Sequence, residues 1–354
     1  MDIYVMEGLQ VVDIISEYHS IVWNAQYFDK GEFVMVCPAS SKVLEALQVG
    51  RYLVRSEDYI GGNEMQNVMV ISKFKLDYDA ETGWLVTVSG YGLKSIVGKR
   101  VVWNQTSVTG YTEDVIRQVI NDNIISPADP DRAISNFLMD EPVGFTDETE
   151  VQLLGENIAD WLSEICRQYG YGWDVYIKNG KYRFKLYAGK DRTYSQNVNP
   201  VVVFSPQFDN LITASYEMDI EGMKNAALVG GEGEGASQRT ATIGTATDID
   251  RNEEYIDGGS VSSNGEIITL TQYISMLADY GQTQLDNTQF TQKFSGDINP
   301  DGTFKINRDF FLGDIVQIQN DKGIQGESRI IEIIYSEDDS GYRVVPTFSD
   351  WEVE

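Results

Sequence analysis

The sequence predicts an α+β fold that is mainly β, with two similar β-rich segments on either side of an inserted helix-and-hairpin module. Strand-like runs fill the first hundred residues and return in the last third, and the clearest helix is followed at once by a strong hairpin pattern. Two glycine-opened β segments near the ends also resemble each other. We therefore divide the 354 residues into a first small β-barrel over 1–98, an αββ module over 99–204, and a second β-barrel with one helix over 205–354.

The first segment is predicted as a series of strands and hairpins. A turn at Asp29–Gly31 joins "SIVWNAQYF" to "EFVMVCP", "VGRYLVR" is a further strand, and "NVMVISKFKLDYD" pairs with "GWLVTVSGYG" around "AETG". The single histidine, His19, comes just before a strand, and we expect it at the surface or at a strand edge.

The middle segment predicts two helices. Residues 112–125 have Thr112 as an N-cap candidate, and residues 157–170 begin at an Asn157 cap and end at Gly170. Asp160 stands three residues after the cap, in a position like that of a capping box. Cys166 lies on the apolar stripe of the second helix, so we expect it to face a core.

A hairpin follows the second helix directly. Asn179–Gly180 is the preferred two-residue type I′ turn. Closure on that turn sets three pairs on one face, namely Ile177 opposite Tyr182, Val175 opposite Phe184 and Trp173 opposite Leu186. Because the helix stripe, which includes Trp161 and Ile165, can cover this face, we interpret the aromatic row as core rather than as a sugar-binding platform.

The last third returns to β structure around one helix at about 271–287. Gly313 opens the strand "FFLGDIVQIQ" and Gly341 closes the hairpin "ESRIIEIIYSEDDSGYRVVPTF". Gly50 and Gly83 hold the same places in the first segment, before "RYLVR" and in "GWLVTVSG". This loose internal repeat is the basis for two similar barrels.

Composition excludes several classes of function. A net charge of -28 argues against binding nucleic-acid phosphates or an anionic membrane over a wide area. No apolar run approaches membrane-spanning length, and the opening residues lack the pattern of a signal peptide. Cys37 and Cys166 are far apart, so we expect buried thiols in a chain made in a reducing cytoplasm.

The inventory of side chains also argues against catalysis. One histidine makes the usual zinc sites and Cys–His pairs hard to build, and 55 acidic residues make carboxylate pairs expected by chance. We expect no catalytic residue, no cofactor and no metal. The stretch "DINPDG" matches calcium-loop positions at Asp297 and Asp301, but Arg308 stands where the final glutamate belongs, so we interpret it as a hairpin turn.

The stretch "LVGGEGEGASQR", from Leu228 to Arg239, looks like a phosphate-binding loop. Gly231, Gly233 and Ala236 fit the dinucleotide pattern, but no helical period follows and Ala236 stands where a P-loop needs lysine. Glu232 and Glu234 would also repel phosphates. We interpret the stretch as a glycine-rich strand end or loop.

Several segments, in this order, are similar to the tail-hub proteins of siphophages of the ReqiPepy type. They are "SIVWN", "GEFVMVCP", "LVTVSGYGLKSIVGKR", "WLSEICRQYGYGWDV", "FKLYAGKDRT", "NAALVGGEGEGASQR" and "LGDIVQI". The resemblance makes the glycine-glutamate stretch a structural motif, and we expect Arg239 to pair with Glu232 or Glu234, in the same or a neighbouring chain. The motif residues are Gly230, Gly231, Glu232, Gly233, Glu234, Gly235, Arg239, Gly313 and Asp314.

The family is itself similar to the baseplate hub of contractile phages, in which three chains with two tube-type barrels each form a pseudo-sixfold ring. The resemblance implies a homotrimeric virion protein at the tail tip, without catalysis, with other tail proteins (distal tail, tube and tape measure) as partners and DNA passing through an acidic channel. Many relatives carry a hydrolase or fibre-like extension after the hub, whereas this chain ends at Glu354. The alternative is a carbohydrate-binding or carboxylate-based cell-wall hydrolase, motivated by 20 tyrosines and many acids.

Overall fold

The computed structural model forms two compact units, the first made of residues 1–215 and 294–354 and the second of residues 216–293. It describes residues 1–60, 63–263, 268–286, 288, 291–296, 298–299, 302–323 and 325–349. Asp297 and Asp301, of the calcium-like stretch, lie outside the described residues. The predicted mainly β class is confirmed. No helix in the described part of the chain is long and apolar enough to cross a membrane.

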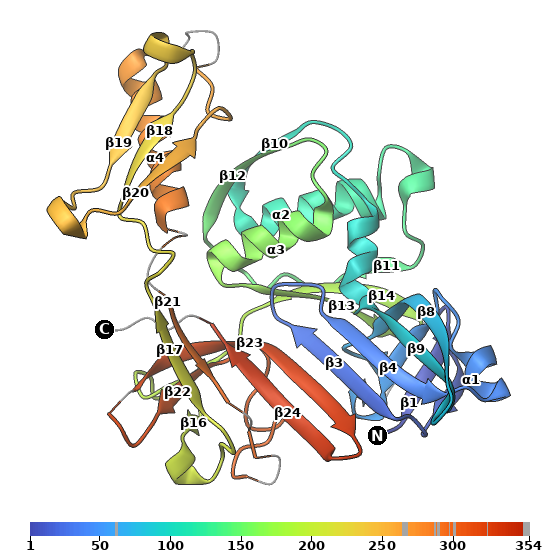
Figure 1. Cartoon of the computed structure of the whole chain (residues 1–354). Helices are drawn as coiled ribbons and strands as arrows, with labels where there is room; N and C mark the ends of the chain where they lie inside the picture. The colour runs from blue at the N-terminus through green and yellow to red at the C-terminus, as the bar shows by residue number, and fades with distance from the viewer. Residues whose placement is uncertain are drawn as a thin grey trace. The chain divides into compact units, whose positions relative to one another are not determined.

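A large mixed sheet dominates the first unit (Figure 1). Its strands are β1 (Ile3–Glu7), β2 (Gln10–Ile15), β3 (Ser20–Gln26), β4 (Glu32–Pro38), β5 (Tyr52–Arg55), β8 (Met69–Asp79), β9 (Gly83–Gly92), β17 (Ser215–Asp219), β21 (Thr291–Ser295), β22 (Ile315–Gln319), β23 (Gln325–Asp338) and β24 (Gly341–Phe348). Of these, β17 and β21 span the two chain boundaries between the units. The order is β17-β21-β24-β23-β3-β4-β9-β8-β5-β1-β2, and β22 pairs with β23. The short strands β15 (Asp191–Arg192) and β16 (Val203–Phe204) pair with β22. The predicted hairpins β3–β4, β8–β9 and β23–β24 are all present.

The first and last segments of this sheet repeat the same local structure. β5 pairs antiparallel with β8 before the β8–β9 hairpin, and β22 pairs antiparallel with β23 before the β23–β24 hairpin. The register shifts between Ile71 and Lys73 in one hairpin and between Ile330 and Glu332 in the other. Each shift comes at the same distance from the aspartate, Asp79 or Asp338, that ends the strand. A bulge at matching places in two strands is a strong sign of structural duplication.

The hydrogen bonds that precede the two bulges also match. The N–H groups of Gly50 and Gly313 donate to the carbonyls of Ile71 and Ile330, both at 2.8 Å. The N–H groups of Ile71 and Ile330 donate in turn to the residues that follow the two glycines, both at 2.9 Å. Gly50 and Gly313 have φ of 90° and 95°, a region that favours glycine. No closed barrel is found among the described residues, so the two barrels stay a prediction.

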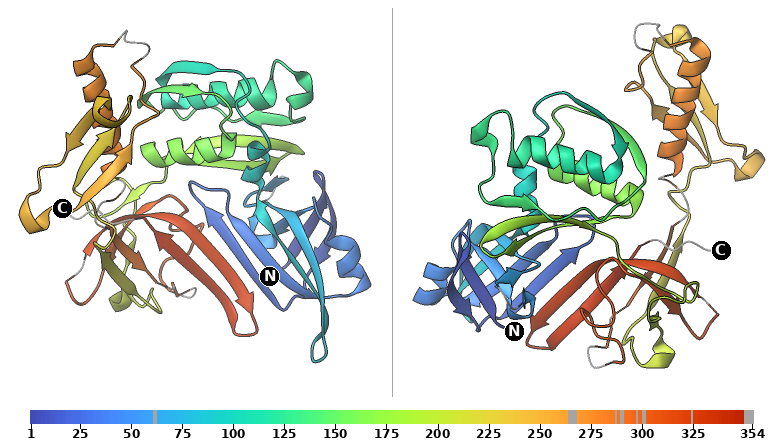
Figure 2. Two further views of the ribbon diagram at one scale, coloured as in Figure 1. Left: turned by 45° about the horizontal axis from the view of Figure 1, so that its top comes forward. Right: turned by 180° about the vertical axis from the view of Figure 1, so that it is seen from behind.

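The inserted module over 99–204 contains two helices and three strands of a smaller sheet, which two short strands of the first segment complete. Its helices are α2 (Thr112–Ile120), which continues as a π-helical turn over Asn121–Ile125, and α3 (Ile158–Tyr169). The smaller sheet has the order β11 (Phe137–Met139), β14 (Lys181–Tyr187), β13 (Gly172–Lys178), β7 (Glu64–Met65) and β6 (Tyr59–Ile60). A two-stranded sheet of β10 (Thr106–Tyr111) and β12 (Glu148–Leu153) completes the module, and the short helix α1 (Ser41–Ala46) lies outside it. Figure 2 shows α2 and α3 together over one side of the β13–β14 hairpin.

The predicted pairing of the β13–β14 hairpin is confirmed at all three positions. Asn179 and Gly180 both have positive φ, as a type I′ turn requires. Trp173 and Phe184 are fully buried and share one core with Trp161 and Ile165 of α3. The aromatic row is therefore core and not a surface platform.

Two details of the helix ends differ from prediction. Thr112 is the first residue of α2, and Tyr111 holds the cap position without a side-chain bond. Asn157 does cap α3, accepting from the N–H groups of Ala159 and Asp160. The Asp160 carboxylate, however, binds Lys30 Nζ at 2.8 Å instead of returning to the cap, because a cation from the β3–β4 turn is within reach.

The second unit packs one helix on a three-stranded sheet. Its strands β18 (Ala226–Gly230), β19 (Thr240–Ile243) and β20 (Glu253–Asp257) have the order β19-β18-β20, and the helix is α4 (Leu270–Asp286), close to the predicted 271–287. Val229 meets Tyr273 and Leu277 in the core. Elsewhere in the chain, Cys37 and Cys166 are buried free thiols and His19 is exposed, as predicted.

Candidate functional site

The glycine-glutamate stretch is the end of the β18–β19 hairpin. The Gly231 N–H donates to the Arg239 carbonyl, and the Arg239 N–H donates to the Glu232 carbonyl, both at 2.8 Å. A 3₁₀ turn at Gly235–Ser237 closes the loop, and β19 follows instead of a helix. The predicted strand end is therefore confirmed.

Two glycines in this hairpin make room for tyrosine hydroxyls. A Cβ atom added at Gly230 would lie 2.0 Å from Tyr255 Oη, and one at Gly231 would lie 2.5 Å from Tyr273 Oη. The Tyr273 hydroxyl accepts from the Glu232 N–H and donates to the Val261 carbonyl. The glycines therefore serve close packing against α4 and β20, not the approach of a phosphate.

Glu232 is the anchor of the loop. Its carboxylate accepts from the Ser263 N–H at 2.7 Å and the Ser263 hydroxyl at 2.6 Å. Arg239 Nη1 lies 3.3 Å from the same carboxylate, so the expected arginine pair forms with Glu232 within one chain. The Ser263 hydrogen bonds hold the pKa of Glu232 below its usual value. The side chain is thus fixed as an anion.

Several backbone donors of the loop are already engaged. A phosphate cradle needs several free N–H groups aimed at one point. Here five of them donate within the protein, at Gly231, Glu232, Ser237, Gln238 and Arg239. This geometry and the fixed charge of Glu232 argue against a nucleotide site.

Gly313 and Asp314 form the second predicted motif. They contact Tyr27, which follows β3, and Gly189 and Lys190, which precede β15. A Cβ atom added at Gly313 would lie 2.2 Å from the Tyr27 ring, and one at Gly189 would lie 1.7 Å from the Gly313 carbonyl oxygen. Tyr27 is fully buried, and its hydroxyl accepts from the Gly189 N–H at 3.2 Å. Glycine is required at Gly313 because the Tyr27 ring fills the space of a side chain, and at Gly189 because the backbone of Gly313 does.

A buried ion pair between Arg192 and Asp314 joins two of these segments. The Asp314 carboxylate accepts from Arg192 Nε, from the Lys190 N–H at 2.7 Å and from the Phe311 N–H at 3.0 Å. The side chains of Arg192 and Asp314 are 6% and 3% exposed. The pair holds β15, near the end of the inserted module, beside the start of β22. Sequence reasoning singled out "FKLYAGKDRT" and "LGDIVQI" separately and missed this contact, because nothing in one sequence links two distant segments.

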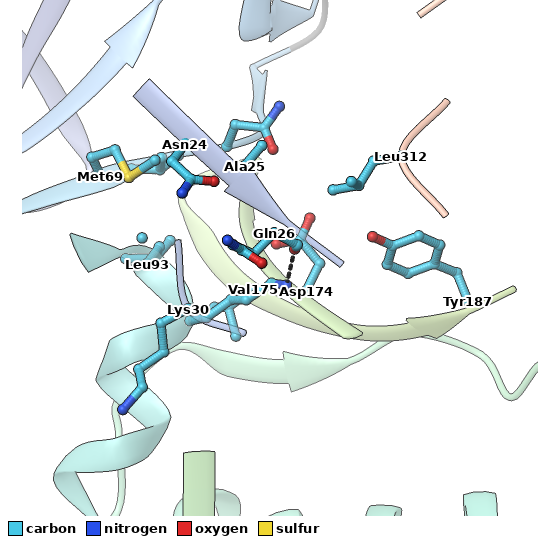
Figure 3. Close-up of a pocket in the computed structure, with 14 residues that line it drawn as sticks. Asn24, Ala25, Gln26, Lys30, Met69, Leu93, Asp174, Val175, Tyr187 and Leu312 are labelled. Atoms are coloured by element: carbon cyan, nitrogen blue, oxygen red, sulfur yellow. Dashed lines mark hydrogen bonds between the residues drawn. The ribbon is translucent and has the colours of Figure 1, made fainter. Parts of the chain in front are cut away.

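A small cavity lies where β3 and β13 approach each other (Figure 3). Its volume is about 30 Å³, and its lining includes Gln26, Asp174, Tyr187 and the buried Lys94. Ligand pockets are commonly on the order of 300–1,000 Å³, so this cavity suits a water molecule. Lys94 Nζ donates to the carbonyls of Gln26, Tyr27 and Asp29. These hydrogen bonds hold the β3–β4 turn in place. No pattern around Lys94 in the sequence indicated this role.

A larger, open depression of about 360 Å³ lies beside the β23–β24 turn. Glu337 in its wall binds the amino-terminal ammonium of Met1 at 2.8 Å. Burial raises the pKa of Glu337, but the hydrogen bonds from the Met1 ammonium and the Tyr18 hydroxyl lower it overall. A glycosidase acid needs a raised pKa, so Glu337 does not fit that role. The part of the chain that the structure describes holds no group of three His, Cys, Asp or Glu side chains suited to a metal ion.

The fold is shared with solved phage tail proteins. One is the 43 kDa tail protein of prophage MuSo2 from Shewanella oneidensis, with a TM-score of 0.60, 13% identity and 98% of each chain covered. Another is a tail protein from Neisseria meningitidis MC58, with a TM-score of 0.58, 11% identity, and 98% of this chain and 95% of that chain covered. A chain of the lidded Francisella PdpA–VgrG complex matches all of this chain over 54% of its own length, with a TM-score of 0.50 and 9% identity. No curated protein matches.

These likenesses define the fold as one of phage tail proteins. The chain belongs to the siphovirus ReqiPepy6 Gp37-like protein family, whose model matches residues 2–349. The resemblance predicted from the ordered sequence signatures is confirmed.

Proposed function

We propose that this siphovirus tail protein is a non-catalytic hub at the tail tip, where three copies form a pseudo-sixfold ring that ends the tail tube and lets DNA pass. The observation that carries the proposal is the duplication, in which Gly50 and Gly313 open matching strand sets with matching hydrogen bonds. Three chains with two such sets present six similar faces, as a tube with sixfold symmetry requires.

Charge supports a role in passing DNA. With 55 acidic and 27 basic residues, the chain has a large net negative charge that disfavours binding of phosphates. An acidic channel wall drawn from both repeats would keep DNA from sticking as it leaves the tube.

The described residues favour a structural role over the hydrolase alternative. Trp173 and Phe184, which a sugar-binding platform would expose, are fully buried. The proposed partners are other tail proteins and two further copies of the chain, and the proposed location is the virion, at the tail tip.

Two measurements test the proposal, the position of the protein in phage particles and the mass of its assembly in solution. Gold-labelled antibody against this chain should mark the tip of phage particles, and the protein at high concentration should sediment as a trimer. Label along the tail shaft, or label absent from particles, would contradict the hub.

A further inference from the structure

The sheet of the second unit has one covered face and one open face. The registers of β18 with β19 and with β20 assign each side chain to one of the two. The face towards α4 carries Ala227, Val229, Ala241 and Ile256, which are all buried. The other face carries Leu228, Thr240, Thr242, Glu253, Tyr255 and Asp257, which are all exposed. We call these six residues the open face.

Two large side chains lie at the centre of the open face. Leu228, on the middle strand, pairs with Tyr255 of β20. Leu228 is 45% exposed and Tyr255 is 56% exposed. The solvent side of a sheet usually carries polar side chains, whereas a tyrosine beside an aliphatic side chain is typical of a surface that binds a partner.

The glycine-glutamate motif holds Tyr255 in place. A Cβ atom added at Gly230 would lie 2.0 Å from Tyr255 Oη, so the tyrosine reaches over β18 at a point where only glycine leaves room for it. Gln238 Nε2 donates to Tyr255 Oη at 3.2 Å and to the Gly231 carbonyl at 3.3 Å. The ring is therefore fixed before any partner arrives, which lowers the entropy cost of binding.

Two carboxylates flank the ring. Glu253 and Asp257 lie on β20 before and after Tyr255, on the same face of the strand. Arg251 Nε binds Glu253 at 2.6 Å, which neutralises that carboxylate. Asp257 accepts from the Gly259 N–H at 2.9 Å and has no cation as partner among the described residues. The open face thus presents an aromatic ring beside a carboxylate that lacks a counter-charge.

We propose that the open face is the docking surface for another protein of the tail, and that an arginine of that partner stacks on Tyr255 and pairs with Asp257. Arginine suits the site because its planar cation binds an aromatic face and a carboxylate together. Leu228 packs against an apolar side chain next to that arginine. A sugar would also stack on tyrosine, but the free charge of Asp257 favours a cation.

The charge of the second unit supports a basic partner. Residues 216–293 include 13 acidic and 4 basic side chains. Such a surface attracts a basic segment and repels an acidic one, including another copy of this chain, whose net charge is -28. The proposal rests on the proposed function for the place of the partner in the tail, but it does not depend on a ring of three copies.

Site-specific photocrosslinking in phage particles tests the surface. With p-benzoylphenylalanine in place of Thr242, which pairs with Leu228, this chain should crosslink to another tail protein at a peptide that contains arginine. The matched control has the same crosslinker in place of Met276, which is 41% exposed on α4 of the same unit. Because α4 covers the opposite face of the sheet, the control should give no crosslink to that peptide.

Charge variants test the chemistry of the contact. Asp257→Lys should lower the crosslink yield from position 242 by about tenfold or more, because the partner's arginine then meets a like charge. Asp257→Asn keeps the acceptor for the Gly259 N–H and should also lower the yield, as should Tyr255→Leu, which removes the ring. Asp279→Lys makes the same charge change at an exposed position of α4 and should leave the yield unchanged.

The outcomes separate the docking surface from the hub. A crosslink from position 242 to another copy of this chain, or no crosslink to any protein above the control, overturns the docking surface even where gold label marks the tail tip. A partner peptide without arginine, or yields that all three open-face variants leave unchanged, overturns the stacked arginine.

Discussion

Arg55 stacks over Tyr335, with its guanidinium carbon 3.5 Å from the ring centroid. The contact joins β5 of the first repeat to β23 of the last, and both side chains are buried. Arg55 Nε also donates to Asp58 at 2.6 Å, whereas its two terminal nitrogens have no hydrogen-bond partner among the described residues. The stacking therefore joins the two repeats at this point, while the ion pair with Asp58, within the first repeat, holds Arg55 in place.

Replacing Arg55 with Met should destabilise the protein by about 3–5 kcal/mol, because Asp58 is left as a buried charge without its cation. The double variant Arg55→Met with Asp58→Asn should recover much of this loss, since no buried charge remains. Urea unfolding of the two variants measures the difference. Equal stability of the single and double variants would contradict the account.

Replacing Trp173 with Ala should cost about 3–5 kcal/mol of unfolding free energy as a large deletion from the core. Trp103 is a matched control because it is 65% exposed, and its replacement with Ala should cost less than about 1 kcal/mol. Denaturant titration followed by circular dichroism measures both. If the Trp173→Ala replacement left the unfolding free energy nearly unchanged, the result would favour the sugar-platform interpretation.

Lys94 should give the stability a specific pH dependence. Burial lowers its pKa from 10.5 to about 8. Between these values the unfolded chain holds a proton that the folded chain has released, so the contribution of Lys94 to stability rises with pH across that window. Across the whole window, the contribution of Lys94 to the unfolding free energy rises by about 3 kcal/mol.

The Lys94→Met variant isolates this effect from that of the tyrosines. The unfolding free energy of the native protein minus that of the variant should increase from pH 8 to pH 10, as measured by urea titration at each pH. A difference that stays flat, or that falls, would show that Lys94 remains charged when folded.

The loop from Gly230 to Gly235 should bind no nucleotide, because the N–H groups of Gly231 and Glu232 already donate within the protein and the Glu232 carboxylate is held by Ser263 as an anion. Calorimetric titration with ATP, GTP, NAD and FAD should give no heat of binding. Micromolar binding that disappears in the Gly233→Val variant would reverse this interpretation.

Local patterns predicted local structure well. Asn179–Gly180 set the register of its hairpin, and the stripe of α3 predicted that Trp161 would be buried, because both depend on residues close in sequence. The Gly50 and Gly313 match was visible as a loose repeat, but its matching bulges needed coordinates. The Arg192–Asp314 contact and the separate unit over 216–293 depend on long-range packing, which one sequence does not encode in any local pattern.

The most direct test of the central claim is a cryo-electron microscopy map of the tail tip in phage particles. The account predicts a closed ring of three copies in which the first and last repeats alternate around a central acidic channel. A map in which this chain forms no closed ring, or in which the two repeats do not alternate, would contradict it.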